Sequence, residues 1–303
     1  MSTRASVTTD VATDHLIAAP DIRTEGVVRR VLRHRSAQLG LGILAFFLLM
    51  TLAAPVVFHS DPSNNWLYQS VADARLGPSA KHLLGTDQLG RDVLLRLAYG
   101  ARFTLLIGLA AVALGLAVGV PLGAASGFFG GIVDLLIQRL VDIVLAFPTF
   151  LLALALVAAL GGGLTNVIIS VAVTSFPRFV RLLRAQALSV RELPYVEAAK
   201  ALGVPTRTVL FRHIVPNSVA PVIVQATLDL GGVILTAAGL GFLGVGIQQP
   251  TPEWGAMLGS SRDFIYSNPN LITFPGLCIM AAVLAFNLVG DALRDVLDPR
   301  LTG

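Results

Sequence analysis

Glu197-Ala-Ala-Lys-Ala-Leu-Gly203, followed by His213-Ile-Val-Pro216, is a polar stretch that interrupts the long apolar runs of this chain. Apolar segments lie on both sides of it, and arginines are frequent before and within it: Arg181, Arg184, Arg191, Arg207 and Arg212. Loops rich in Lys and Arg remain on the cytoplasmic side of a membrane. The stretch therefore predicts a cytoplasmic docking surface on a membrane protein.

The composition excludes a soluble globular protein. Of the 303 residues, 54% are hydrophobic and only 13% are charged, and the mean hydropathy is +0.75. The net charge is +4, and nearly all of the basic residues are arginines clustered outside the apolar runs, a pattern that orients helices and does not indicate nucleic acid. The single cysteine, Cys278, lies in the last apolar run and is expected to be a small buried side chain.

Six apolar runs predict an all-α polytopic membrane protein with six transmembrane helices, because about 20 apolar residues cross the hydrocarbon core. The predicted spans are 38–58, 103–126, 132–160, 164–183, 218–243 and 271–290. An even number of spans places both chain ends on one side of the membrane. We therefore expect a cytoplasmic N-terminal tail over 1–37, disordered at its start, and a cytoplasmic C-terminal tail over 291–303.

The segments between the spans complete the expected organisation. The loop 184–216 is cytoplasmic, whereas 59–102 and 244–270 are extracytoplasmic. Residues 103–290 form the transmembrane core domain. Within the second span, glycines recur at spacings of four or seven, namely Gly108, Gly115, Gly119, Gly123 and Gly127. Small residues on one helix face let helices approach closely in lipid, so the core is expected to be tightly packed.

The polar stretch itself predicts two short helices. The first begins near Leu193-Pro194 and ends at Gly203, since proline favours the first helical turn and glycine the residue after the last. The second runs from Thr206 to Ile214, and Pro216 ends it. Small alanines on the first helix let another protein approach its backbone. A plain amphipathic surface helix is the alternative, and the local pattern does not decide between the two.

Several segments together resemble one family, the binding-protein-dependent ABC importer permeases. The stretch from Glu197 to Pro216 is similar to the E-A-A…G loop of that family. Further segments resemble the C-type permease of the dipeptide/oligopeptide/nickel subfamily, in the order of that family: Leu84-Gly-Thr-Asp-Gln-Leu-Gly-Arg-Asp92, Ala146-Phe-Pro148, Leu240-Gly-Phe-Leu-Gly-Val-Gly246, Pro250-Thr-Pro-Glu-Trp-Gly-Ala-Met-Leu258, and Asn287-Leu-Val-Gly-Asp291 to Leu297-Asp-Pro299.

The resemblance implies half of the pore of an ATP-driven importer in a bacterial or archaeal inner membrane, for peptides or related small solutes such as glutathione or nickel chelates. It implies as partners a second, B-type permease, two cytoplasmic P-loop ATPase domains that use ATP and Mg, and an extracytoplasmic substrate-binding protein. It assigns the ATPase contact to a coupling helix and its flank: Glu197, Ala198, Ala199, Gly203, His213 and Pro216. The only lysines, Lys81 and Lys200, lie in no P-loop motif, so no ATP site is expected here.

Two positions depart from the pattern of the family. Gly241 stands where a serine is frequent, and Asp229 lies in the fifth predicted span. A carboxylate inside a membrane helix is costly unless it faces the bundle or water. Asp229 therefore either lines the translocation path, where it could contact a substrate amine, or makes an interhelical hydrogen bond.

The remaining polar residues predict local structure and one alternative function. Arg139 and Asp142 are spaced to pair on the third span, near Asp134. If Asp229 and these charges carried ions or protons, the chain would be a secondary transporter or channel.

Catalysis and metal binding have no candidates, because His82 and His213 lack further ligands at metal spacing and no Ser/His/Asp or Cys/His set is apparent. A membrane-embedded hydrolase is therefore not expected.

Two helices are expected in the extracytoplasmic segments. Thr86 or Asp87 can cap one, in which Asp87 and Arg91 pair and which lies against the membrane surface. Thr251 can cap the other, with Pro252 at its first position. The external loop carrying Pro252, Glu253 and Trp254 could meet a substrate-binding protein.

Overall fold

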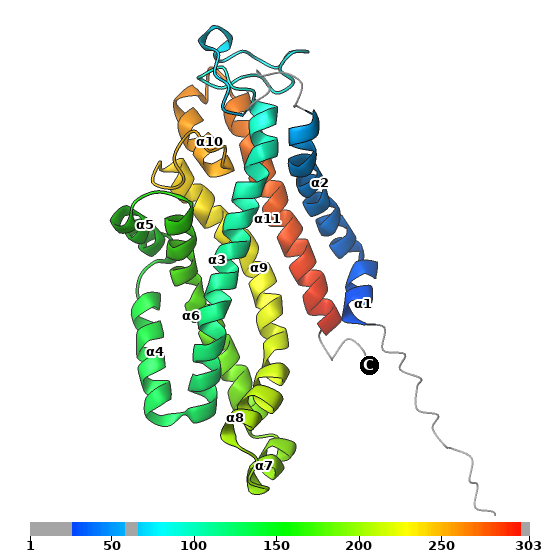
Figure 1. Cartoon of the computed structure of the whole chain (residues 1–303), viewed down its shortest axis with the longest axis vertical. Coiled ribbons are helices and arrows are strands. Elements are labelled where there is room, and N and C mark those ends of the chain that lie inside the picture. The colour runs from blue at the N-terminus through cyan, green and yellow to red at the C-terminus, as the bar shows by residue number, and fades with distance from the viewer. Residues whose placement is uncertain (1–25, 58–65, 298–303) are drawn as a thin grey trace, which may run out of the picture.

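Long helices form an elongated bundle in the computed structural model, which describes residues 26–57 and 66–297 (Figure 1). The helices are α1 (Val27–Arg33), α2 (Arg35–Val57), α3 (Val93–Phe129), α4 (Gly131–Leu145), α5 (Thr149–Leu160), α6 (Leu164–Arg191), α7 (Pro194–Ala201), α8 (Thr206–Thr208), α9 (Val215–Phe242), α10 (Trp254–Ser261) and α11 (Asn270–Leu297). Short 3₁₀ turns cover Val71–Asp73 and Arg262–Phe264. The start of the predicted N-terminal tail, the end of the C-terminal tail and residues 58–65 lie outside the described residues.

The all-α polytopic prediction is confirmed. Within residues 26–57 and 66–297, five helices are long and apolar enough to cross a membrane: Arg35–Val56, Val93–Phe129, Leu164–Arg191, Thr206–Phe242 and Asn270–Leu297. A sixth crossing is obtained if the bent pair α4 and α5 counts as one span. Several helices run beyond the predicted spans, because charged residues such as Arg96 and Arg184 continue the helix outside its apolar part.

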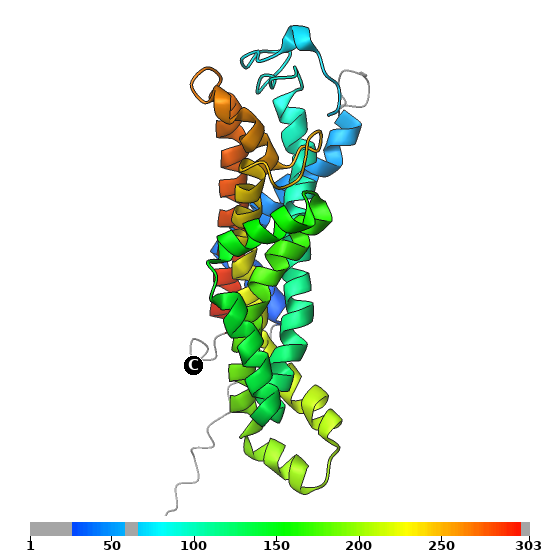
Figure 2. The ribbon, with the colours of Figure 1, turned by 90° about the vertical axis from the view of Figure 1, so that its left-hand side faces the viewer.

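The third predicted span, 132–160, is wrong as a single helix. The chain leaves α4 at Leu145 and restarts as α5 at Thr149, with a bend of 88° between the two helices. Pro148 cannot donate a helical hydrogen bond, and it disfavours helical backbone at the preceding residue, Phe147. As Figure 2 shows, α5 consequently runs across the long axis of the bundle instead of continuing α4.

The close helix packing predicted from the glycines occurs between α3 and α6. A Cβ atom added at Gly119 would lie 2.6 Å from the Cβ of Phe179, and one added at Gly123 would lie 2.7 Å from the carbonyl oxygen of Val180. Such separations are well below van der Waals contact. Only glycine therefore lets these two helices approach so closely.

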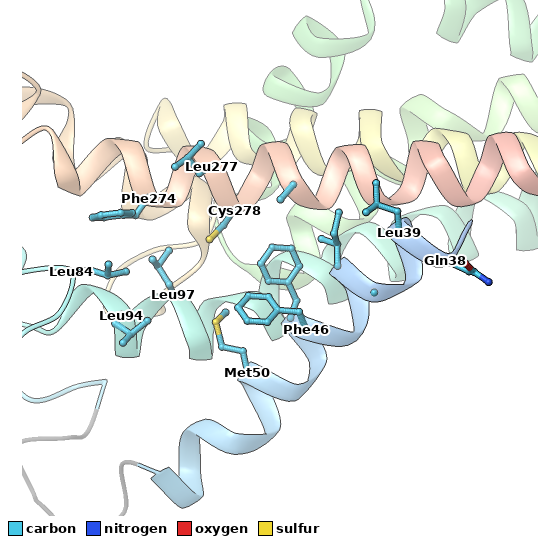
Figure 3. A pocket seen from close by; sticks show the side chains of 14 residues that line it. Gln38, Leu39, Phe46, Met50, Leu84, Leu94, Leu97, Phe274, Leu277 and Cys278 are labelled. Carbon is cyan, nitrogen blue, oxygen red and sulfur yellow. The ribbon is translucent and has the colours of Figure 1, made fainter. Parts of the chain in front are cut away.

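A groove runs between α2 and the pair α3 and α11. It encloses about 610 Å³ and has an almost wholly apolar lining. Figure 3 shows Phe46 and Met50 of α2 and Leu97 of α3 around this space, with Cys278 of α11 at its wall. Cys278, expected to be buried, is only half-buried at the edge of the groove.

The second helix of the polar stretch does not end at Pro216. Thr206–Phe242 is a continuous 37-residue helix that passes through Pro216. The segment Val209–Ile214, directly before the proline, is π-helical. A local π adjustment satisfies the backbone groups that a proline leaves free, so the helix continues through it.

The expected helix at Thr86 or Asp87 is also wrong. The carboxylate of Asp92 caps α3 by accepting from the amide of Leu95 at 2.9 Å. Asp87 and Arg91 do pair, with 2.6 Å between Oδ2 and Nε, but they lie in a turn rather than on a helix. This segment forms a turn instead of a helix because Gly90 adopts a φ of +71°, a left-handed conformation that glycine allows.

Candidate functional site

α7 forms a short helix at the end of the bundle that lies opposite α10 (Figures 1 and 2). Pro194 occupies its first turn and Gly203, with φ +74°, follows its last, so the predicted helix is confirmed. The amide of Val204 donates to the carbonyl of Ala199 at 3.1 Å, and the amide of Gly203 donates to that of Lys200 at 3.0 Å. These two bonds define a Schellman turn, which needs a left-handed residue at Gly203.

The surface of α7 is open on the side that faces away from the bundle. Val196 is fully buried and holds the helix on the bundle, whereas Glu197 and Ala198 are exposed. Leu202 is 83% exposed. Exposed apolar side chains gather on and around the helix, namely Leu193, Tyr195, Leu202 and Phe211. These exposed apolar side chains make this end of the bundle the candidate docking surface.

Two basic side chains connect α7 and the adjoining end of α6 to the end of α3. The Nη1 of Arg191 donates to the carbonyls of Gly127 and Phe128 at the end of α3, at 3.4 and 3.3 Å. The ammonium of Lys200 lies 5.8 Å from the ring centroid of Phe128. Arg191 at the end of α6 and Lys200 on α7 therefore both contact the end of α3.

The structure brings the two halves of the polar stretch together. The ring of His213 lies 6.1 Å from that of Tyr195, next to α7. Pro216 is exposed in the first turn of α9. The residues assigned to the ATPase contact by resemblance thus share one end of the bundle, although their role stays a prediction.

Two ion pairs connect α4 to α6. Asp134 accepts two hydrogen bonds from Arg184, from Nε and from Nη2, each at 2.6 Å. Asp142 pairs with Arg181 at 2.7 Å. The expected pairing of Arg139 with Asp142 is therefore wrong, because this carboxylate turns toward the packed helix α6 instead. Asp134 and Asp142, two of the carboxylates considered for ion transport, are thus engaged by arginines.

Asp229 lies on α9 against a cavity of about 200 Å³ between α5, α6 and α9. Its side chain is 7% exposed, and Oδ1 accepts from Nε2 of Gln225 at 3.0 Å and from Nη1 of Arg178 at 3.2 Å. Both interpretations drawn from the sequence are thus compatible with its position, since it bonds to α6 and also faces a cavity. Arg178 was missed as its partner, although an arginine directly after Pro177 inside an apolar run is a visible signal.

At the other end, Pro252, Glu253 and Trp254 are buried, so the expectation that they contact a binding protein is wrong. Glu253, rather than Thr251, caps α10, because its carboxylate can accept from two amides of the first turn, at 2.7 and 2.8 Å. Thr104 of α3 donates to the same carboxylate at 3.2 Å. Burial raises the pKa of Glu253, and these hydrogen bonds oppose the shift.

Trp254 joins α10 to α2 and α3. Its indole nitrogen donates to the carbonyl of Leu97 at 3.1 Å, and its ring lies 5.0 Å from that of Phe47. These contacts explain its complete burial. Pro252, Glu253 and Trp254 therefore stabilise the fold at the α10 end of the bundle instead of forming a docking surface.

His82 makes a local contact. The Nδ1 of His82 lies 2.9 Å from Oδ2 of Asp92, so this ring is held by the residue that caps α3. Within the described part of the chain, no group of three or more His, Cys, Asp or Glu residues is placed to hold a metal ion.

Comparison with known proteins gives matches over nearly the whole chain. The family described as "Binding-protein-dependent transport system inner membrane component" matches residues 119–303, and the "N-terminal TM domain of oligopeptide transport permease C" matches residues 24–78. The dipeptide transport system permease protein DppC of Alkalihalophilus pseudofirmus is 46% identical over 90% of this chain and 88% of its own length.

Other relatives agree with these matches. The di/tripeptide permease DppC of Pseudomonas aeruginosa is 48% identical over 86% of this chain and 88% of its own. The glutathione permease GsiD of Pectobacterium atrosepticum is 43% identical over 90% of each. Among solved structures, an inward-facing MetNI methionine ABC transporter has a TM-score of 0.54 at 21% identity, covering 67% of this chain and 97% of that one, which shows the shared fold.

The long helices, the exposed α7 and the matches along the chain lead to one conclusion. This chain belongs to the binding-protein-dependent transport system inner membrane components, as a C-type permease subunit of the dipeptide/oligopeptide subfamily of ABC importers.

Proposed function

We propose that this chain forms half of a translocation pore for di- and tripeptides, including peptide-like solutes such as glutathione. The names of its relatives support this substrate class, since they are a dipeptide, a di/tripeptide and a glutathione permease. A second, B-type permease completes the pore. Two P-loop ATPase domains bind and hydrolyse ATP with Mg, and this chain binds neither.

α7 carries the proposal, because it is an exposed helix with an apolar tip that is fastened to the transmembrane bundle. It would lie in a cleft of a cytoplasmic ATPase domain, with Glu197, Ala198, Ala199 and Leu202 at the contact. The arginines of the surrounding loop favour the cytoplasm for this end. Both chain ends would then be cytoplasmic, and the α10 end would face the substrate-binding protein.

The contacts suggest how ATP drives transport. Closure of the ATPase domains would draw the α7 helices of the two permeases together. Arg191 and Lys200 would pass this movement to α3, and the continuous helix Thr206–Phe242 would pass it to Asp229 at the cavity. The bundle would then change from an inward-open to an outward-open state that accepts substrate.

Affinity purification of the tagged chain from its native membranes in mild detergent, with mass spectrometry of the bound proteins, tests the proposal. The informative variant is Leu202→Glu, since this side chain is 83% exposed and the change leaves the core intact. Leu83→Glu is the matched control, because Leu83 is 62% exposed and belongs to the segment before α3, which lies at the opposite end of the bundle (Figure 1).

We expect a P-loop ATPase and a second permease with the wild type and with Leu83→Glu. Leu202→Glu should lose the ATPase and keep the second permease. A wild-type complex that contains the second permease but no ATPase would overturn the proposal, as would equal ATPase recovery with both variants.

A further inference from the structure

The cavity beside Asp229 has free hydrogen-bond acceptors. Oδ2 of Asp229 is buried and has no hydrogen-bond partner among the residues that the structure describes. The hydroxyls of Thr174 and Ser175 donate to the carbonyl of Val171 at 2.8 and 2.6 Å, and that of Thr236 donates to its own helix. Their protons are used, so these hydroxyls offer lone pairs.

An ammonium group fits this arrangement. A buried carboxylate oxygen without a partner is costly, and the cost is greater within a membrane span. An ammonium is a pure donor with three protons and a positive charge. It would satisfy Oδ2 of Asp229 and find further acceptors in the hydroxyls of the cavity wall.

The same cavity also has a positive side. The side chain of Arg178 is 53% exposed, so part of its guanidinium is available beyond the bond to Asp229. Thr149 and Phe150, the first residues of α5, line the cavity, and no side chain caps this helix start. The free amides at a helix N-terminus favour a carboxylate, as in the broken helices of other transporters.

We propose that Arg178 and Asp229 form a binding site for the charged ends of a free peptide. Asp229 binds the α-ammonium, and Arg178 with the start of α5 binds the carboxylate. Without substrate the two side chains pair with each other. When a peptide binds, this ion pair breaks, and each side chain pairs with the oppositely charged end of the peptide. The inference rests on the proposed function and deepens it, because this chain then selects peptides with uncapped termini.

The test is ATP-dependent uptake into liposomes that contain the whole complex and its binding protein. The probes are radiolabelled alanyl-alanine, trialanine and glutathione. Asp229→Asn keeps the shape of the side chain and removes its charge. A double exchange, Asp229→Arg with Arg178→Asp, restores an ion pair in reverse. Asp142→Asn is the matched control, because its pair with Arg181 is exposed on both sides.

Asp229→Asn should lower uptake about tenfold or more, as expected for a lost charge-assisted hydrogen bond. ATPase stimulation by the binding protein should persist, and Asp142→Asn should stay within about twofold of the wild type, as for an exposed pair. The double exchange should not restore uptake. If it does, the pair is only structural and the inference fails.

Unchanged uptake by Asp229→Asn would equally overturn the inference. A wild-type complex that transports none of the three probes would instead contradict the proposed peptide function. The two failures are therefore separate results of one experiment.

Discussion

Replacement of Gly203 should weaken the connection to the ATPase in a graded manner. This residue adopts a φ of +74°, and an added Cβ would meet nothing within 4 Å. A substitution there therefore acts only through the backbone conformation. Alanine in the left-handed region costs about 1–2 kcal/mol. Asparagine tolerates this region better, and the β-branched valine tolerates it less well.

The magnitude follows from this cost. A penalty of about 1–2 kcal/mol lowers the population of the native Schellman turn roughly 5- to 30-fold relative to other conformations. ATP-driven peptide uptake by the reconstituted complex should therefore be reduced least in Gly203→Asn, more in Gly203→Ala and most in Gly203→Val. The amount of ATPase that stays bound to the complex should fall in the same order.

Gly244→Ala is the control for the backbone effect. Gly244 has a φ of +78° and equally open surroundings, but it follows α9 at the other end of the bundle. Its replacement should leave ATPase binding unchanged. Equal losses from Gly203→Ala and Gly244→Ala would refute the reasoning, and so would three Gly203 variants that all match the wild type.

Three further outcomes are expected. Gly119→Ala should overpack the α3–α6 contact at a cost of about 1–3 kcal/mol and so lower the melting temperature. Gly42→Ala is the control, because its added Cβ meets nothing within 4 Å, and equal melting temperatures of the two variants would contradict the packing. Because the pKa of Glu253 is raised in the folded state, the free energy of unfolding should fall as the pH rises from about 4.5 through the higher folded pKa. Thermal melts at several pH values should show this fall in the wild type, and Glu253→Gln should remove the contribution of Glu253 to it. Arg184→Ala should destabilise the protein more than Arg181→Ala in thermal melts. Arg184 makes a bidentate, partly buried pair with Asp134, whereas the exposed pair of Arg181 is worth at most about 1 kcal/mol. The reverse order would be inconsistent with these contacts.

Periodicity and helix punctuation predict the parts of this structure that are locally determined. The length of each apolar run fixes where a membrane helix can lie, and Pro194 with Gly203 fixes both ends of α7. The bend at Pro148 was also visible in the sequence. It was missed because the apolar composition continues on both sides, and composition alone cannot distinguish a broken helix from a straight one.

The partners of polar side chains could not be predicted from local spacing. Asp142 prefers Arg181 on another helix to Arg139 on its own, and Asp229 finds Arg178 across the bundle. The burial of Trp254 has the same origin, since its pocket is built by α2 and α3. Such contacts depend on how the helices pack in three dimensions.

Cysteine cross-linking tests the central claim most directly. The chain contains one cysteine, so Cys278→Ser provides a background without thiols. In that background, Leu202→Cys places a single thiol directly after α7. Leu83→Cys places one in the segment before α3, which lies at the opposite end of the bundle (Figure 1). A short bifunctional reagent applied to the intact complex should join Leu202→Cys, and not Leu83→Cys, to a P-loop ATPase subunit. Cross-linking of Leu83→Cys to the ATPase, or failure of Leu202→Cys to reach it in a complex that still hydrolyses ATP, would contradict the account.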